Sequence, residues 1–233
     1  MIRVVDDIRA THLDYPNLVL TIGSFDGVHR GHHAILDAVV RRARAINGTP
    51  AVLTIRPHPR EFFSPDHAPS LLTHSAKKLE LFEAAGIDAM IFLRFNADVA
   101  TLEPEDFVRE IIVERCRAKA VAVGHDFRFG KNARGDFELL ASLAPQHGFE
   151  VEQVPALLMD GERVSSTLIR ERLLLGDLVK AEAFLGRPYS LVGKVVPGRR
   201  IGTTIGFPTA NIKPHHSAIP AQGVYVCEAK VGG

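Results

Sequence analysis

The sequence predicts an α/β fold built on a parallel sheet, and two patterns along the chain indicate it. Four short runs are almost entirely apolar, at residues 18–25, 51–56, 89–95 and 120–124. Near-continuous apolar runs of this kind are typical of parallel strands that are covered on both faces. Stretches with helical periodicity lie between them, and such alternation implies β-α units with right-handed crossovers.

Each expected helix carries a signal in its sequence. The first has one apolar stripe with most of its charged side chains opposite. The second ends at Gly86, which suits a C-cap, and the third begins with Pro104, which is tolerated in a first turn. The fourth has Asp136 as its expected N-cap. The expected helices cover residues 32–46, 75–86, 104–116 and 136–148.

The pattern changes at about residue 186. Beyond it we expect short strands separated by turns, with no helix between them. The remaining 187–233 segment is too short for a typical independent domain. The sequence therefore divides into residues 1–186 and the start of a small β domain.

Composition excludes several classes of function. Of the 233 residues 46% are apolar, which allows a sizeable core, and 28 basic side chains balance 27 acidic ones. A chain with this charge balance is not expected to have the strongly basic face that nucleic-acid binding usually needs. Two distant cysteines predict neither a disulfide framework nor a zinc site. No signal peptide and no apolar run of ~20 residues is present, so we expect a cytoplasmic protein without a membrane partner.

The stretch IGSFDGVHRGHH, residues 22–33, joins the first apolar run to the first expected helix. In an open α/β sheet ligands bind at such a turn, and the helix N-terminus favours an anion. Gly23 and Gly27 let the backbone approach closely, while His29 and His32 add two donors. No Walker loop or dinucleotide fingerprint occurs. The stretch therefore suits the α-phosphate of a nucleoside triphosphate.

Two other interpretations of this stretch stay open. The histidines could mark a metal site, although no partner cluster at metal-ligand spacing is evident. They could also be only a polar helix start. Asp26 could be a general acid, but the sequence favours a structural role in which it accepts N–H groups within the turn.

A second phosphate motif is expected at VSSTLIRERL, residues 164–173. Ser165, Ser166 and Thr167 supply hydroxyl and N–H groups at a helix start, and Arg170 supplies a fork for phosphate oxygens. A flat aromatic ligand would suit the stiff Pro-His-Pro loop at 57–59, which two phenylalanines follow. That loop could equally be an ordinary proline turn.

These stretches resemble one family. GSFDGVHRGHH is similar to the signature of the HxGH nucleotidylyltransferases, and VSSTLIRERL resembles the second phosphate motif of their FMN adenylyltransferases. Residues 123–136 and 186–212 resemble segments of the bacterial bifunctional riboflavin kinase/FMN adenylyltransferases, the latter including G-F-P-T-A-N. The resemblance covers essentially the whole chain, in the family's order.

The resemblance implies a Rossmann-like parallel-sheet nucleotidylyltransferase domain at 1–186, followed by the start of a riboflavin kinase-like β-barrel at 187–233. It implies that FMN and ATP give FAD and pyrophosphate, with Mg²⁺ accompanying ATP. The family's proposed kinase base lies beyond the end of this chain, so kinase activity is not predicted for it. The strand edges of an incomplete barrel would favour self-association.

The expected roles follow residue by residue. We expect His29 and His32 on the α-phosphate and bridging oxygen, and Ser166 and Arg170 on the pyrophosphate. The expected ATP-binding residues are Gly23, Ser24, Phe25, His29, Gly31, His32, Gly124, Asp126, Ser165, Ser166, Thr167 and Arg170. The expected flavin-binding residues are Pro57, His58, Pro59, Phe63, Asp126, Phe127 and Phe129. Thr209 and Asn211 match kinase positions that help to bind Mg-nucleotide, and no side chain of the transferase domain is expected to hold metal.

The sequence departs from the family at Arg56, His125 and Thr203. Two other functions therefore stay open. One is a related transferase that uses phosphopantetheine, nicotinamide mononucleotide or CTP, against which the Pro-His-Pro loop and the kinase-like tail argue. The other is a flavin- or nucleotide-binding module without turnover, against which the two intact phosphate motifs argue.

Overall fold

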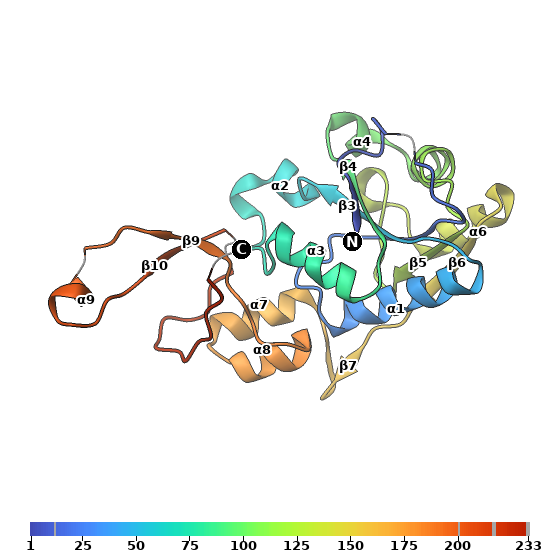
Figure 1. The fold of residues 1–233 in the computed structure, drawn as a ribbon. Helices are drawn as coiled ribbons and strands as arrows, with labels where there is room; N and C mark the ends of the chain where they lie inside the picture. The colour runs from blue at the N-terminus through green and yellow to red at the C-terminus, as the bar shows by residue number, and fades with distance from the viewer. Residues whose placement is uncertain (12, 200, 216–217, 232–233) are drawn as a thin grey trace.

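A six-stranded sheet with the order β1-β4-β3-β2-β5-β6 forms the centre of the protein (Figure 1). The computed structural model describes residues 1–233 except 12, 200, 216–217 and 232–233. All paired strands of this sheet run parallel, so the predicted fold class is confirmed. The short edge strands β1 and β6 were not predicted. The strands are β1 Arg3–Val5, β2 Val19–Ile22, β3 Pro50–Arg56, β4 Ala89–Arg94, β5 Ala120–Gly124 and β6 Glu150–Val154.

The strand order reverses beside β2. From β2 the chain builds β3 and β4 on one side, and then β5 and β6 on the other. Leu20 of β2 accordingly pairs with Ala51 of β3 and with Val121 of β5. Ligands of such sheets bind beyond the carboxyl ends of the strands at this reversal. Here that place lies past Ile22 and Gly124.

Helices cover both faces of the sheet because successive strand side chains point to opposite faces. Val19 and Val52 pack with the helices α1 and α3 in one cluster. Leu20 and Leu53 pack with α5, η2 and α6 in another. The helices are α1 Arg30–Ala45, α3 Ser75–Ala84, α5 Pro104–Phe107, the π-helix η2 Val108–Arg115 and α6 Phe137–His147.

The predicted helix ends are close to the observed ones. Asp136 is the N-cap of α6, since its side chain accepts from the Leu139 N–H at 3.0 Å. The α3 helix has Ala85 as its C-cap, and Gly86 follows it with φ +82°. The first helix begins two residues earlier than expected, because His29 caps it.

A pair of helices forms a third hydrophobic cluster beside the sheet. The helices α7 (Ser166–Leu174) and α8 (Leu178–Leu185) bury Ile169 and Phe184 there, together with Leu72. Short elements connect the layers of the fold. They are α2 Pro59–Phe63, η1 Pro65–His67, α4 Ala97–Thr101, η3 Lys131–Ala133, and the hairpin strands β7 Leu158–Met159 and β8 Glu162–Arg163.

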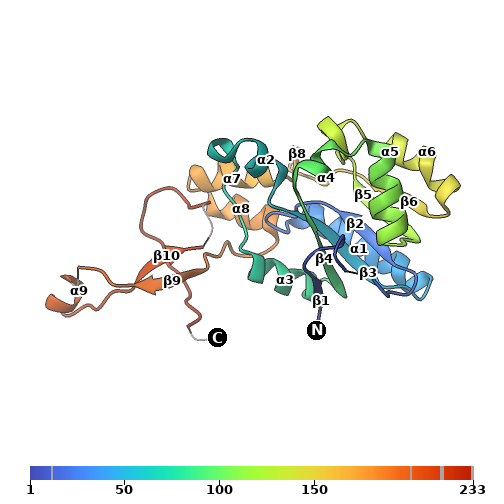
Figure 2. The same cartoon turned by 90° about the horizontal axis from the view of Figure 1, so that it is seen from above.

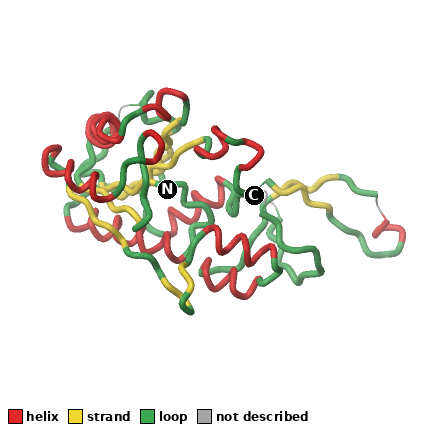
Figure 3. Tube along the Cα trace, turned by 180° about the vertical axis from the view of Figure 1, so that it is seen from behind, coloured by secondary structure: helices red, strands yellow, loops and turns green. Residues whose placement is uncertain are grey.

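The last part of the chain contains an arm that projects away from the sheet (Figures 1, 2 and 3). Its antiparallel strands are β9 (Gly193–Val196) and β10 (Asn211–Pro214). Between them lies the short helix α9 (Ile201–Thr204), so the prediction of a tail without a helix is wrong. A domain boundary at residue 186 stays a prediction.

The chain returns from the arm to the helical layer. The Ala218 N–H donates to the Leu71 carbonyl at 3.1 Å, and the Ala221 N–H donates to the Leu173 carbonyl at 2.9 Å. The Tyr189 hydroxyl donates to the Ala218 carbonyl at 2.5 Å. The arm is therefore held at both of its ends. Within the described part of the chain, no helix combines the length and apolarity needed to cross a membrane.

Candidate functional site

A cleft of about 790 Å³ opens where the strand order reverses. This volume is within the range of small-molecule sites. Its lining comes from the ends of β2, β3 and β5, the starts of α1 and α7, and the loop before α3. Every residue expected to bind ATP lies in that lining: Gly23, Ser24, Phe25, His29, Gly31, His32, Gly124, Asp126, Ser165, Ser166, Thr167 and Arg170.

His29 and His32 form a closely packed pair at the start of α1. His29 is the N-cap, and its Nδ1 accepts from the His32 N–H at 3.2 Å. In return, Nδ1 of His32 accepts from the His29 N–H at 3.4 Å. The two rings stack with centroids 3.6 Å apart and an angle of 16° between their planes. The histidines thus form a reciprocal capping box.

This arrangement keeps both histidines neutral at pH 7. Burial, followed by the charges of His33 and Arg187, lowers the pKa of His29 to about 4. Burial, followed by His29 and Lys78, lowers the pKa of His32 well below its usual value. Because each Nδ1 accepts a hydrogen bond, we assign the ring proton to Nε2 in both residues. Each ring therefore keeps one N–H donor for a ligand.

Two glycines leave room for the close packing of the rings in this turn. A Cβ on Gly31 would lie 3.2 Å from the His29 ring and 3.4 Å from the Val164 carbonyl oxygen. A Cβ on Gly23 would lie 3.0 Å from the Phe25 ring, which itself packs against His32 at a centroid distance of 4.9 Å. Larger residues at either position would move the rings that line the cleft.

Asp26 joins the turn to two distant segments. Its buried carboxylate accepts from the N–H groups of Leu72 at 3.0 Å and Thr73 at 3.1 Å. It also pairs with Arg170, whose Nη2 lies 2.6 Å from Oδ2. The expected structural role is thus present, but its backbone donors come from the loop before α3 and not from its own turn.

The start of α7 is attached to the same turn. Ser165 caps the helix by accepting from the Leu168 N–H at 3.2 Å, and the Ser166 hydroxyl donates to the Asp26 carbonyl at 2.7 Å. The Arg170 Nε donates to the Ser70 carbonyl at 2.6 Å. The two predicted phosphate motifs therefore lie on opposite sides of one hydrogen-bonded network.

Some residues expected to bind flavin lie in the cleft and others do not. Pro57, His58, Asp126 and Phe127 line it, and His58 caps α2 by accepting from the Arg60 N–H. Outside the lining lie three expected flavin residues. They are Pro59 in the first turn of α2, Phe63 in an exposed cluster with Phe62 and Phe95, and Phe129 in the core, where it stacks on Phe127.

Lys78 lines the cleft and was not predicted. This half-buried lysine on α3 donates from Nζ to the Ser24 carbonyl at 2.8 Å. Burial lowers the pKa of Lys78, while Asp26 opposes that shift. Its partner lies 54 residues away along the chain, so no local sequence pattern indicates the contact.

The residues that depart from the family motifs have identifiable contacts. Arg56 lines the cleft and lies over the Phe92 ring at 4.4 Å. The Arg163 Nη1 lies 2.9 Å from Nε2 of His125 and 3.5 Å from the Asp126 carboxylate. The side chain of Thr203 lies outside the described residues.

The candidate metal ligands of the tail lie apart from the cleft. Asn211 begins β10 and Thr209 shortly precedes it, so both belong to the projecting arm. Among the described residues, no group of three His, Cys, Asp or Glu side chains is placed to hold a metal ion. Cys116 is buried and Cys227 is exposed, and both are free thiols.

Comparisons with known proteins match two parts of the chain. Residues 12–168 match the family model for FAD synthetase, and residues 185–233 match the model for riboflavin kinase. The bifunctional riboflavin kinase/FMN adenylyltransferase of Escherichia coli K12 is 40% identical over 210 residues, covering 90% of this chain and 67% of that protein. The protein of the same name from Pseudomonas fluorescens is 36% identical over all 233 residues, covering 74% of its own length.

One solved structure has the same fold over nearly the whole chain. A crystal structure from Streptococcus pneumoniae, described as a macrolide-efflux protein, superposes with a TM-score of 0.85 at 28% identity. The match covers 95% of this chain and 72% of the other.

Proposed function

Because the chain belongs to the FAD synthetase family, we propose that it is an FMN adenylyltransferase that transfers AMP from ATP to FMN. One observation carries the proposal. The neutral, stacked pair His29 and His32 lies at the N-terminus of α1, and the start of α7 lines the same cleft. Two helix N-termini and two N–H donors together favour a polyphosphate.

The reaction is an in-line displacement at the α-phosphorus of ATP. An oxygen of the FMN phosphate forms the new P–O bond, the bond to the bridging oxygen breaks, and pyrophosphate leaves with the bonding electrons. The second pKa of a phosphate monoester is about 6, so this nucleophile is mostly dianionic at pH 7. The transfer therefore needs positioning and charge stabilisation more than a general base.

The proposed hydrogen-bond donors would face the phosphate oxygens on which negative charge develops as pyrophosphate leaves. The Nε2–H groups of His29 and His32 would bind the α-phosphate and the bridging oxygen. Arg170 would bind the leaving pyrophosphate through Nη1, which has no hydrogen bond to the described residues, while Nε and Nη2 hold the side chain in place. Because the Ser166 hydroxyl already donates to Asp26, its proposed role is to present the N-terminus of α7.

Lys78 extends this set of donors toward the flavin side. Lys78 donates to the Ser24 carbonyl in the phosphate turn and shares the cleft lining with His58 of the Pro-His-Pro loop. Burial is the largest cause of the lowered pKa of His32 and of His58, and the charge of Lys78 adds to both shifts. We assign it to the phosphate of FMN. Pro57, His58 and Phe127 would then contact the flavin ring, with Asp126 at the edge between flavin and nucleotide.

Mg²⁺ is proposed to enter with ATP. Among the described residues no group of three His, Cys, Asp or Glu side chains is placed to hold a metal ion. Phosphate oxygens and water would coordinate the ion, and it would neutralise phosphate charge. A cytoplasmic location, self-association and the absence of nucleic-acid partners stay predictions.

The proposal is tested by incubating the chain with FMN, ATP and Mg²⁺ and following FAD and pyrophosphate by chromatography. Riboflavin serves as a parallel substrate, and a His29→Ala, His32→Ala double variant is the control. We expect FAD from FMN but no product from riboflavin. No FAD from FMN would refute the proposal, and bound flavin without pyrophosphate release would identify a binding module.

A further inference from the structure

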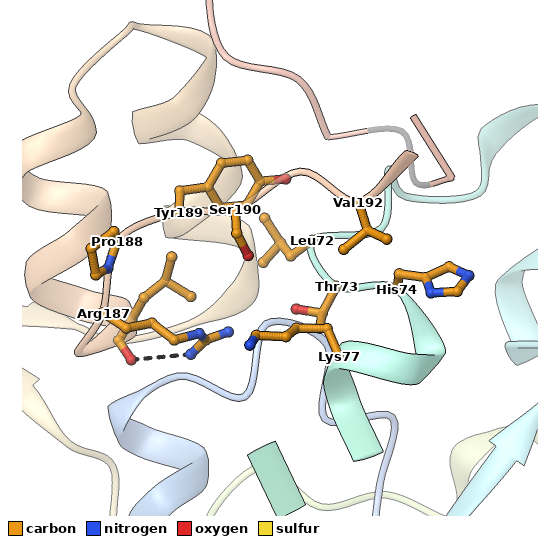
Figure 4. Close-up of a pocket in the computed structure, with 10 residues that line it drawn as sticks. Leu72, Thr73, His74, Lys77, Arg187, Pro188, Tyr189, Ser190 and Val192 are labelled. Atoms are coloured by element: carbon orange, nitrogen blue, oxygen red, sulfur yellow. Dashed lines mark hydrogen bonds between the residues drawn. The ribbon is translucent and has the colours of Figure 1, made fainter. Parts of the chain in front are cut away.

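We propose that Arg187 is a positioning residue of the adenylyl-transfer site, a role that rests on the function proposed above. Arg187 lies beyond the C-cap of α8, yet its guanidinium reaches the turn between β2 and α1. Nη2 donates to the Gly27 carbonyl at 2.5 Å, and Nη1 donates to the Val28 carbonyl at 2.9 Å. A third bond, from Nη1 to the Leu185 carbonyl at 3.4 Å, fixes the guanidinium near its own helix (Figure 4).

The turn that Arg187 holds has an unfavourable backbone. Phe25 has φ +49°, Gly27 has φ +90° and Val28 has φ +40°. Glycine adopts such angles readily, but a β-branched residue like Val28 is an outlier there. Strained backbone of this kind persists only when surrounding contacts over-determine it. The turn therefore needs external partners to keep its shape.

Arg187 is such a partner. Gly27 and Val28 are both buried, and a buried carbonyl without a donor is costly. Among the described residues, the guanidinium is the donor that reaches both carbonyls. A planar guanidinium with paired N–H groups can serve two neighbouring carbonyls at once, which a single ammonium does less well.

The consequence for the site follows from chain connectivity. His29 comes directly after Val28, and its ring holds His32 through the reciprocal cap and the 3.6 Å stack. A shift in the two carbonyls would move both rings together. The positive charge of Arg187 also disfavours protonation of both histidines, lowering their pKa values after the larger effect of burial.

The position of Arg187 in the sequence makes this contact unexpected. Residue 187 lies within the segment that matches riboflavin kinase, whereas the turn lies in the segment that matches FAD synthetase. The first residues of the kinase-like segment would thus complete the transferase site. Arg30 provides a matched comparison, because it also joins α1 to α8, with Nε donating to the Ala183 carbonyl at 2.9 Å, but contacts neither turn carbonyl.

The test compares Arg187→Ala, Arg187→Lys and Arg30→Ala in the full chain. For Arg187→Ala we expect kcat for FAD formation to fall roughly 10- to 100-fold, with a smaller change in the KM of ATP. Sub-denaturing guanidinium should restore part of that activity, and Arg187→Lys should retain more activity than Arg187→Ala. Arg30→Ala should stay within about twofold of the parent chain. Activity of Arg187→Ala within twofold of the parent, or a loss that guanidinium does not restore, would overturn the proposal.

A second measurement separates this inference from the proposed function. The ring-proton NMR resonances of His29 and His32 report on their stacking, whether or not the chain turns over FMN. We expect them to shift in Arg187→Ala and to stay in place in Arg30→Ala. Unchanged resonances in Arg187→Ala would refute the positioning role, whereas an inactive parent chain would refute the transferase proposal alone.

Discussion

The Asp26–Arg170 ion pair allows stability and catalysis to be separated by substitution. Replacing Asp26 with Asn keeps an oxygen that can accept from Leu72 and Thr73 but removes the negative charge. The two side chains are only 5% and 18% exposed, and their charged atoms lie 2.6 Å apart. Leaving one member of a buried pair without its partner typically costs 3–5 kcal/mol. We expect Asp26→Asn to lower the free energy of unfolding by about 3 kcal/mol, at the lower end because Arg170 reaches some solvent.

A double-mutant cycle identifies the cause of that loss. In Asp26→Asn, Arg170→Met the unpaired charge is gone, so the free energy of unfolding should recover relative to the sum of the two single losses. FAD formation should not recover, because the proposed pyrophosphate donor is missing. The measurements are urea unfolding and chromatography of FAD. Glu103→Gln is the control, since it breaks exposed ion pairs with Lys131 and Arg134, and none of these three residues lines the cleft.

Two results would refute this reasoning. One is an Asp26→Asn variant whose free energy of unfolding lies within about 1 kcal/mol of the parent. The other is strict additivity in the double variant, which would mean that Asp26 and Arg170 contribute independently.

Three further predictions concern the cleft. His32→Ala should lower kcat for FAD formation by ~10²–10³ with little change in the KM of ATP, as for loss of one preorganised donor, and near-normal turnover would contradict the assignment. The stability of the chain should depend on pH through His29. The pKa of His29 is about 4 in the folded chain and 6.5 in the unfolded chain, so the unfolded chain binds the proton first as the pH falls. The contribution of His29 to the free energy of unfolding is fully present above pH 6.5 and decreases by about 3 kcal/mol as the pH falls toward 4. In urea unfolding, the free energy of unfolding of His29→Gln should depend less steeply on pH than that of the parent chain. The same pH dependence in both chains would count against the lowered pKa. Lys78→Gln should lower kcat/KM for FMN roughly 10- to 100-fold, as for loss of a charge-assisted hydrogen bond. Lys77→Gln, at the neighbouring position, should have little effect. Equal effects of the two substitutions in steady-state kinetics would exclude a specific contact between Lys78 and FMN.

The sequence was most informative where structure depends on nearby residues. Parallel strands buried on both faces leave apolar runs, and the cap residue Asp136 lies next to the helix that it caps. The phosphate turn was predictable because its glycines and histidines lie within a few residues of one another. The edge strand β6 was missed because most of its side chains are not buried, so its sequence is polar.

Contacts between distant segments could not be predicted in this way. Arg187 and Gly27 are 160 residues apart, and Asp26 and Arg170 are 144 apart. Their pairing depends on how α7 and α8 pack beside the turn, which no local pattern specifies. Phe129 illustrates the opposite case, because a motif of alternating phenylalanines does not reveal which of its rings faces the cleft and which the core.

The attachment of the arm at both ends affects how the chain tolerates changes in length. The arm leaves the helical layer beyond Tyr189 and returns at Ala218, and the hydrogen bond between these residues closes it into a loop. The free-energy cost of closing a loop, which is entropic, grows slowly, by about 0.6 kcal/mol for each doubling of the loop's length. At its tip, Gly206 has φ +83° and open space around the position of a Cβ. Extra residues inserted there would lengthen a closed loop while leaving the bonds at its base intact, which makes the tip a suitable place for a fluorescent or affinity tag.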